Sequence, residues 1–194
     1  MLKNVQQELN RFAKYVIQQS RTNLTKGGKP FGSYNDTKKL YNSLDYDINV
    51  SANSFSLSFL MEDYGIFKDK GVKGKDPSKV SPNAKIKGQQ APNSPYRFGS
   101  GSSSGKWGDF VGGIEKWAKR KNVRFRDEKG RFKKGNYKSL AYVIANNIYN
   151  RGIKPSLFFT KPFQKAFTNL DKDIIKAYQL DVEELLKFTT NGNN

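Results

Sequence analysis

The feature that most constrains this chain is a long amphipathic stretch near its N-terminus. Between residues 2 and 24, apolar side chains recur every three or four positions, at Leu2, Val5, Leu9, Phe12, Ala13, Val16, Ile17 and Leu24. This spacing places them along one side of an α-helix, and such a stripe must be covered by other elements. Gly27, Gly28 and Pro30 predict the end of the helix, because glycine favours a left-handed cap and proline cannot continue the hydrogen-bond ladder.

The following segment predicts a surface on which this helix can pack. Residues 38–44 are typical of a short helix, and residues 46–61 then switch to an alternation of apolar and polar side chains. A period of two indicates β-strands with one buried face. We therefore predict an antiparallel hairpin with its turn at residues 52–54. Its alternating apolar positions are Ile48, Val50, Phe55, Leu57 and Phe59.

Further helices are predicted in the C-terminal half. Helical spacing begins again at Trp107, and a second amphipathic helix near residues 140–148 is closed by Gly152. A third helix is predicted from about Pro162 to Tyr178, and Asp181 is predicted to cap a final short helix. The expected fold is α+β: a long N-terminal helix and C-terminal helices packed on a small antiparallel sheet, with a basic, partly flexible insertion.

The insertion is the segment from residue 73 to residue 106. It contains four prolines and the run of glycine and serine from Gly99 to Gly105. A segment with so little apolar surface cannot offset the entropy of ordering, so we predict that it is flexible. The chain of 194 residues is otherwise of the length of one ordinary domain, and we predict a single domain, 1–194, that contains this flexible insertion.

Charge is the second strong feature. The chain has 35 Lys or Arg and 17 Asp or Glu, a net charge of +18. Residues 65–138 hold 20 of these basic residues and 6 of the acidic ones. Such a field attracts nucleic acids, anionic membranes or acidic proteins. The densest part is a group of eight cations, here called the basic cluster: Lys119, Arg120, Lys121, Arg124, Arg126, Arg131, Lys133 and Lys134.

Aromatic residues are interleaved with these cations, namely Phe125, Phe132 and Tyr137, with Tyr96 and Arg97 earlier in the chain. Such a mixture is typical of surfaces that stack bases and hold phosphates. The alternative is that the rings pack inward and the cations are simply solvated. Base-specific readout needs a helix or ribbon presented to a groove, and the sequence offers no obvious one. We expect the basic cluster either to face DNA without reading its sequence or to dock on an acidic partner.

Composition argues against catalysis. Cysteine and histidine are both absent, which excludes disulfides, thiol nucleophiles and histidine-based catalysis or metal ligation. The glycine-rich run lacks the glycine and hydroxyl positions of a phosphate-binding loop, and the five acidic pairs are more typical of caps and solvated faces. The prediction is therefore no enzyme, no catalytic residues, no cofactor and no metal. No apolar run has the roughly 20 residues of a membrane helix, so we expect no membrane contact.

Three stretches, taken in order, resemble the small tail-completion or neck protein family of tailed bacteriophages. Residues 37–44 resemble that family's threonine-glycine-x-leucine-x-x-serine segment, with lysine where glycine is usual. Residues 64–72 resemble its tyrosine-anchored stretch, in which Asp69 replaces a glutamate and Val72 a threonine. Residues 158–163 resemble the segment before its C-terminal helix, in which Phe159 and Pro162 match outright. The likeness covers about 110 residues and leaves the basic insertion unexplained.

The resemblance implies a structural virion protein that forms a homo-oligomeric ring around the DNA channel. Such a ring joins the head connector to the tail, so its partners are neighbouring connector and tail proteins. The expected location is the neck or tail of the virion, after assembly in the host cytoplasm, with non-specific contact between the basic insertion and packaged double-stranded DNA. We also expect Phe159 and Pro162 to fix the C-terminal helix on the sheet or to lie at a subunit contact.

Two alternatives come from other classes of protein. The first is an accessory protein, monomeric or dimeric, that binds nucleic acid without reading its sequence, for which the charge of +18 is the footprint. The second, less favoured by the residues, is a small phage hydrolase or nuclease that uses Asp and Lys.

Overall fold

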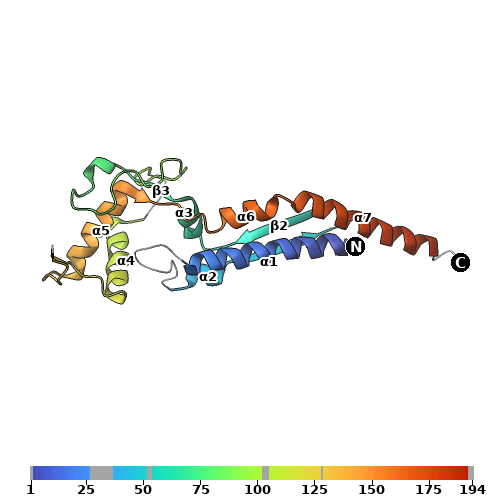
Figure 1. Cartoon of the computed structure of the whole chain (residues 1–194), viewed down its shortest axis with the longest axis horizontal. Helices are drawn as coiled ribbons and strands as arrows, with labels where there is room; N and C mark the ends of the chain where they lie inside the picture. Colours follow the sequence, from blue (N-terminus) through green and yellow to red (C-terminus); the bar gives the residue numbers. More distant parts are fainter. Residues whose placement is uncertain (1, 27–36, 52–53, 102–104, 128, 192–194) are drawn as a thin grey trace. The chain divides into compact units, whose positions relative to one another are not determined.

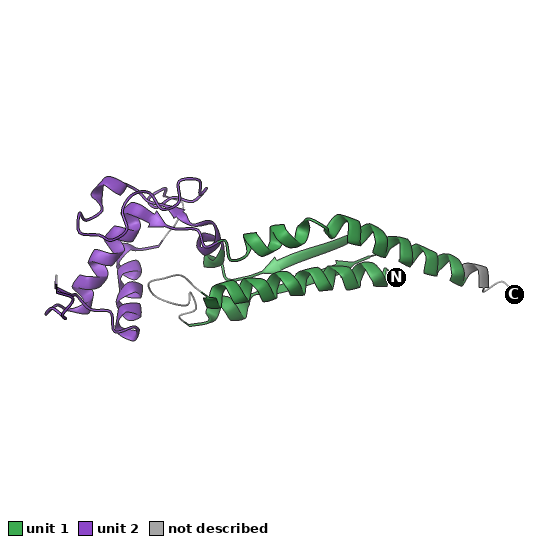
Figure 2. Cartoon of the chain, viewed as in Figure 1, with its two compact units in different colours: residues 1–65, 157–194 green, residues 66–156 purple. Residues whose placement is uncertain are grey.

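The computed structural model describes residues 2–26, 37–51, 54–101, 105–127 and 129–191. Residues 189–191 are described as backbone only. It divides into two compact units, one formed by residues 1–65 and 157–194 and the other by residues 66–156 (Figure 2). The predicted insertion lies inside the second unit. That residues 1–194 form one domain, and that residues 73–106 are flexible, both stay predictions.

The first unit is built on the long N-terminal helix. Helix α1 spans Lys3–Lys26 (Figure 1), and its buried face consists of Val5, Leu9, Phe12, Ala13, Val16, Ile17, Ser20 and Leu24. Seven of these eight positions belong to the predicted stripe, so the helix and its buried face are confirmed. The glycines and proline predicted to end it lie outside the described residues.

A short helix and a hairpin cover part of α1. Helix α2 spans Lys39–Ser43, and strands β1 (Asp45–Val50) and β2 (Phe55–Leu60) pair in antiparallel register with Ile48 opposite Leu57. Ile48, Val50 and Leu57 pack against Val5 and Leu9 of α1. The hairpin is as predicted, although residues 52 and 53 of its turn are outside the described part of the chain.

The C-terminal helices differ from the prediction. One helix was expected over residues 162–178 and another from Asp181, but the structure has α6 over Thr160–Phe167 and α7 over Leu170–Asn191. The break falls at Thr168 and Asn169, where the chain turns. Two carboxylates, Asp171 and Asp173, then occupy the first turn of α7, where they suit the helix dipole. The predicted boundary at Asp181 is therefore wrong.

Asp181 caps a different helix instead. It is 7% exposed in the middle of α7, and its two carboxylate oxygens accept hydrogen bonds from the backbone N–H groups of Asn4 and Val5, at 2.9 and 3.0 Å. These amides belong to the first turn of α1, which has no partner for them within its own helix. The side chain predicted as a local cap is thus a tertiary cap that fastens α7 to the start of α1.

The second unit contains helices α4 (Trp107–Arg120) and α5 (Tyr137–Arg151). It also contains most of α3 (Tyr64–Lys70), whose first two residues belong to the first unit. Val111 of α4 packs on Ala141 and Ala145 of α5. The predicted helices are confirmed, but the apolar side chain of Val143 in α5 is 44% exposed. The buried face of α5 is formed by alanines at 141 and 145, whose small side chains allow the two helices to pack closely.

A second sheet joins distant parts of this unit and was not predicted. Strand β3 (Val72–Lys73) pairs antiparallel with β4 (Gly152–Ile153). Gly152 ends α5 with φ of 90°, and a side chain there would collide with the backbone of β3. Two-residue strands leave no period to detect, so the sequence indicated only a helix end at Gly152.

Residues 73–106 are held at several points along their length, including hydrogen bonds from Ser81 to Asn147 and from Gln90 to Arg151. Lys73 exchanges backbone hydrogen bonds with Tyr96 and Phe98, at 2.8 and 2.9 Å, and the Phe98 ring lies 5.5 Å from that of Tyr149 in α5. A short 3-10 helix, η1, spans Pro77–Lys79. Between Ser81 and Gln90, residues 85–88 are exposed. The fold class is confirmed: the described chain is α+β, with a long N-terminal helix, C-terminal helices and two small antiparallel sheets (Figure 1).

Candidate nucleic-acid interface

The basic cluster occupies the end of α4 and the connection from α4 to α5. Lys119 and Arg120 lie in the last turn of α4, where cations suit the helix dipole, and Lys121 follows as the C-terminal cap residue. The other five cations lie in residues 124–134, and all eight side chains are exposed. The structure therefore brings the cluster together within a single connection.

Residues 124–134 form a small hairpin, here called the basic ribbon. Arg126 bridges Phe132 in antiparallel fashion, the N–H of Lys133 donates to Phe125 O at 2.9 Å, and the N–H of Asp127 donates to Arg131 O at 2.8 Å. Gly130 supports the tight turn with φ of 79°. Residue 128, within this turn, lies outside the described part of the chain.

One face of the basic ribbon carries cations around an exposed ring. Arg126 and Phe132 lie opposite each other, so Arg124, two residues before, shares that face. The guanidinium carbons of Arg126 and Arg124 lie 4.5 and 5.7 Å from the centroid of the Phe132 ring, which is 58% exposed. By the same pairing Lys134, opposite Arg124, belongs to this face. We call Arg124, Arg126, Phe132 and Lys134 the arginine face.

On the opposite face of the basic ribbon, the carboxylate of Asp127 balances the charge of Arg131. Arg131 donates to Asp127 through both its backbone N–H and its Nε, at 2.8 and 2.9 Å. Phe125 is half-buried and lies against Gly135. Beyond the ribbon, Lys119 forms an ion pair with Glu115 one turn earlier, at 2.8 Å. Arg131 and Lys119 thus have carboxylate partners, whereas the described carboxylate of the ribbon, Asp127, faces away from Arg124 and Arg126.

Hydrogen bonds within the chain hold both arginines of the arginine face in place. The Nε of Arg124 donates to Asn122 Oδ1 at 2.9 Å, and the Tyr137 hydroxyl donates to the same oxygen at 3.2 Å. Arg126 donates to Gly130 O at 2.8 Å. A groove of about 420 Å³ opens beside these residues, lined by Phe132, Tyr137 and the lysines at 133 and 134 among others. Each guanidinium group has further N–H donors besides those in these hydrogen bonds.

Tyr96 and Arg97, which the sequence suggested as part of this surface, have other contacts. The Tyr96 ring packs edge-on against Phe67 of α3 at 4.7 Å, and Arg97 donates to Lys75 O at 3.1 Å. Neither lines the groove of the basic ribbon.

Phe159 and Pro162 lie where β2 meets α6. Pro162 is buried in the first turn of α6, and Phe159 is the residue before that helix. The half-buried Phe159 ring lies 5.2 Å from Phe59 of β2 and 5.8 Å from Phe163. Phe12 of α1 joins the same group, 5.7 Å from Phe163. These rings connect α1, β2 and α6.

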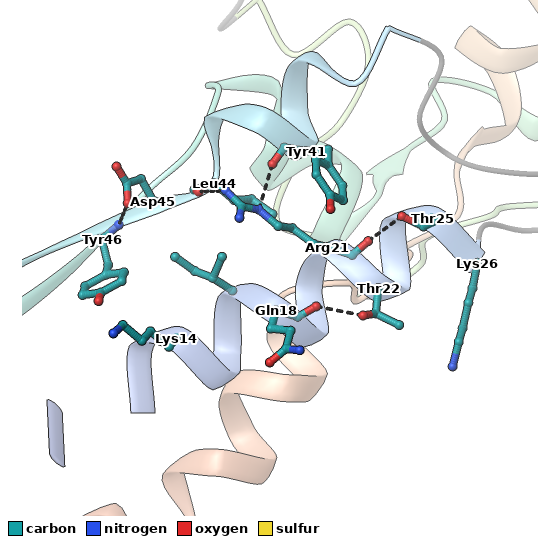
Figure 3. Close-up of a pocket in the computed structure, with 11 residues that line it drawn as sticks. Lys14, Gln18, Arg21, Thr22, Thr25, Lys26, Tyr41, Leu44, Asp45 and Tyr46 are labelled. Atoms are coloured by element: carbon teal, nitrogen blue, oxygen red, sulfur yellow. Dashed lines mark hydrogen bonds between the residues drawn. The ribbon is translucent and has the colours of Figure 1, made fainter. Parts of the chain in front are cut away.

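A larger open groove in the first unit was missed by the sequence analysis (Figure 3). It has a volume of about 740 Å³ and is lined from α1, α2 and β1. Its central cation, Arg21, donates to Tyr41 O and Leu44 O at 3.2 and 2.9 Å and lies over the Tyr41 ring. Arg21 therefore ties α2 to α1, and its role in the fold explains its position better than ligand binding does.

The acidic pairs proposed as alternative chemistry are engaged separately. Glu62 pairs with Lys39 at 2.9 Å, Asp127 with Arg131, and Asp173 with Arg11 at 3.5 Å. In the described ranges no three Asp or Glu side chains gather as a metal site would require. Nor does any described helix have the length and apolar character of a membrane span.

Helix α7 presents exposed apolar side chains near its C-terminal end. Its inner face packs on α1 through Ile174 and Ala177 and reaches the start of α1 at Asp181. The same face continues at Leu185 and Phe188, one and two turns further, where it passes the beginning of α1 (Figure 1). Leu185 is 61% and Phe188 80% exposed.

In comparisons with known proteins, no family model, curated protein or solved structure matches the chain. The function must therefore be argued from the residues and geometry described above.

Proposed function

We propose that this protein is a structural subunit of a tailed-phage virion. It assembles into a ring at the neck or tail-completion position, around the DNA channel and between the head connector and the tail. This is the function implied by the resemblance of residues 37–44, 64–72 and 158–163.

The observation that carries the proposal is the row of exposed apolar side chains at the end of α7. An apolar stripe that continues beyond its intramolecular partner is typical of a surface covered by another chain. Further exposed apolar residues, Ile175, Tyr178 and Leu186, follow each other at helical spacing on an adjacent side of the same helix. A subunit of a ring needs such a surface, since every copy must bind its neighbour.

The direct test is to locate the protein in purified virions of the phage that encodes it. We expect the chain to be detected by mass spectrometry at ring-like copy number, and electron microscopy with a specific antibody to place it between head and tail. Absence from virions, with the protein present in infected cells, would contradict the proposal.

A second candidate is an accessory protein that binds nucleic acid without reading its sequence. One observation favours it: the second unit holds 22 Lys or Arg and 6 Asp or Glu, a net charge of +16, whereas the first unit is at +2. For this candidate the free chain is monomeric or dimeric at concentrations where the ring protein is a larger oligomer. Light scattering of the purified chain separates the two.

A further inference from the structure

The eight cations of the basic cluster differ in their surroundings. Lys119 and Arg131 are paired with carboxylates, Glu115 and Asp127. Arg124 and Arg126 instead share one face with the exposed ring of Phe132. A ligand that needs uncompensated positive charge has the most to gain at this face.

We propose that the arginine face (Arg124, Arg126, Phe132 and Lys134) is a binding site for the phosphate backbone of duplex DNA. The proposal rests on the proposed function in one respect: a subunit around the DNA channel meets duplex DNA as its polyanion. The site itself is argued from the ribbon.

The spacing of the charges fits a backbone. Both guanidinium carbons lie within 5.7 Å of one ring centroid, so they are no more than about 10 Å apart. Phosphates on one strand of a duplex advance about 3.4 Å along its axis per nucleotide and also wind around it, so neighbouring phosphates lie farther apart than this rise. A span of up to about 10 Å therefore meets at most two neighbouring phosphates. Guanidinium groups bind phosphates through two parallel N–H donors, and those held on an exposed ring lose little freedom on binding.

Phe132 acts in this site as a positioning residue. Both cations lie over its ring, so the aromatic surface serves the guanidinium groups and bases have little of it to stack on. A contact with phosphates alone carries no sequence information. Binding at this face is therefore independent of sequence and falls with salt.

The test measures the affinity of the full-length protein for a fluorescein-labelled 20-base-pair duplex by anisotropy, from about 50 to 400 mM salt. The variant R124Q/R126Q/K134Q removes three charges from the arginine face. The matched control K119Q/R120Q/R131Q removes three charges from the same cluster but none from the arginine face or from the groove beside it. All six side chains are exposed, so we expect both variants to fold. Circular dichroism and the melting temperature check this for each variant.

We expect the plot of log affinity against log salt to flatten by about 2.7 for the first variant, since each phosphate contact contributes about 0.9. The control should change it by less than one unit. F132L, which keeps an apolar side chain but removes the ring, should weaken binding about two- to five-fold with the slope unchanged.

Three results would overturn the proposal. Equal flattening by both triple variants would show that the field of the whole unit binds DNA and that this face is not a site. No binding of folded wild-type protein to duplex at 50 mM salt would assign the cluster to an acidic protein partner. Preference for single-stranded DNA that F132L abolishes would mean that bases stack on Phe132. These outcomes are independent of whether the chain forms a ring, which light scattering and virion analysis decide.

Discussion

Asp181 joins the two ends of the first unit. Its carboxylate accepts from two backbone N–H groups of α1 and from the Asn4 side chain, at 2.9 to 3.0 Å. Burial by itself raises the pKa of Asp181, but the hydrogen bonds from Asn4, Val5 and Lys3 outweigh it, and the pKa is lowered from its ordinary value of 3.8. The ionised form is therefore favoured by folding.

Asp181→Ala should lower the free energy of unfolding by about 1 to 3 kcal/mol at pH 7, because it leaves orphan amides at the start of α1. Since the folded pKa is the lower one, this contribution is complete above about pH 4 to 5 and is lost as pH falls through the folded pKa. The free energies of unfolding of wild type and variant, measured in urea, should thus converge as the pH falls below the folded pKa of Asp181. Glu183→Ala, an exposed change two residues away, is the control, and an equal loss there would contradict the capping role.

The roles of single residues were only partly predictable from the sequence. Aspartate favours helix N-termini, which suggested that Asp181 begins a helix, yet the N-terminus it caps belongs to a helix 176 residues earlier. In the same way the eight cations of the basic cluster are equivalent in the sequence. They become different only once Arg126 pairs with Phe132, because a shift of one residue would exchange the two faces of the ribbon.

Helices and strands long enough to repeat their hydrophobic period several times were predictable from the sequence, and very short elements were not. Helix α1 and the β1–β2 hairpin each repeat their period several times, whereas β3 and β4 have two residues each. The break between α6 and α7 has no glycine or proline. Its only local signal is Asn169 followed by Asp171 and Asp173, which is typical of a helix start.

At the junction of α1, β2 and α6, Phe159→Ala should cost about 2 to 3 kcal/mol. This is below the 3 to 5 kcal/mol of a fully buried phenylalanine because the ring is only half-buried. Thermal and urea unfolding measure the loss. Phe167→Ala, in the same helix but 55% exposed, should change stability by less than half as much. An unchanged melting temperature for Phe159→Ala would instead place that ring at a subunit contact.

Residues 73–106, the predicted flexible insertion, lie within the second unit. We expect limited trypsin digestion of the free protein to cut first within residues 73–106, at Lys85 or Lys87. Both are exposed and lie between the anchored residues Ser81 and Gln90. The cut sites can be identified by mass spectrometry of the first fragments. First cleavage within residues 2–24 would be incompatible with α1 as the centre of a core.

For the whole molecule, the end of α7 and the arginine face should respond differently to salt. An apolar contact between copies is not screened by ions, whereas phosphate contacts are. At 0.5 M salt we therefore expect the protein to remain oligomeric while its affinity for DNA falls by several powers of ten. Light scattering and anisotropy on one sample test both, and dissociation of the oligomer by salt would mean that charge holds it together.

The residues responsible can be identified by changing Leu185 and Phe188, which continue the inner face of α7 beyond α1. If both become buried between copies, each contributes about 1.5 to 3 kcal/mol. Leu185→Ser with Phe188→Ser should therefore raise the dissociation constant by about two to four powers of ten and yield a monomer by light scattering. Leu180→Ser is the matched control, because Leu180 is 51% exposed but lies on another side of the same helix. The double variant should keep the melting temperature of the monomer, because both side chains are largely exposed in the single chain. If the double variant keeps the mass of the wild-type oligomer, then a different surface joins the copies, and the end of α7 is left to bind the connector or the tail.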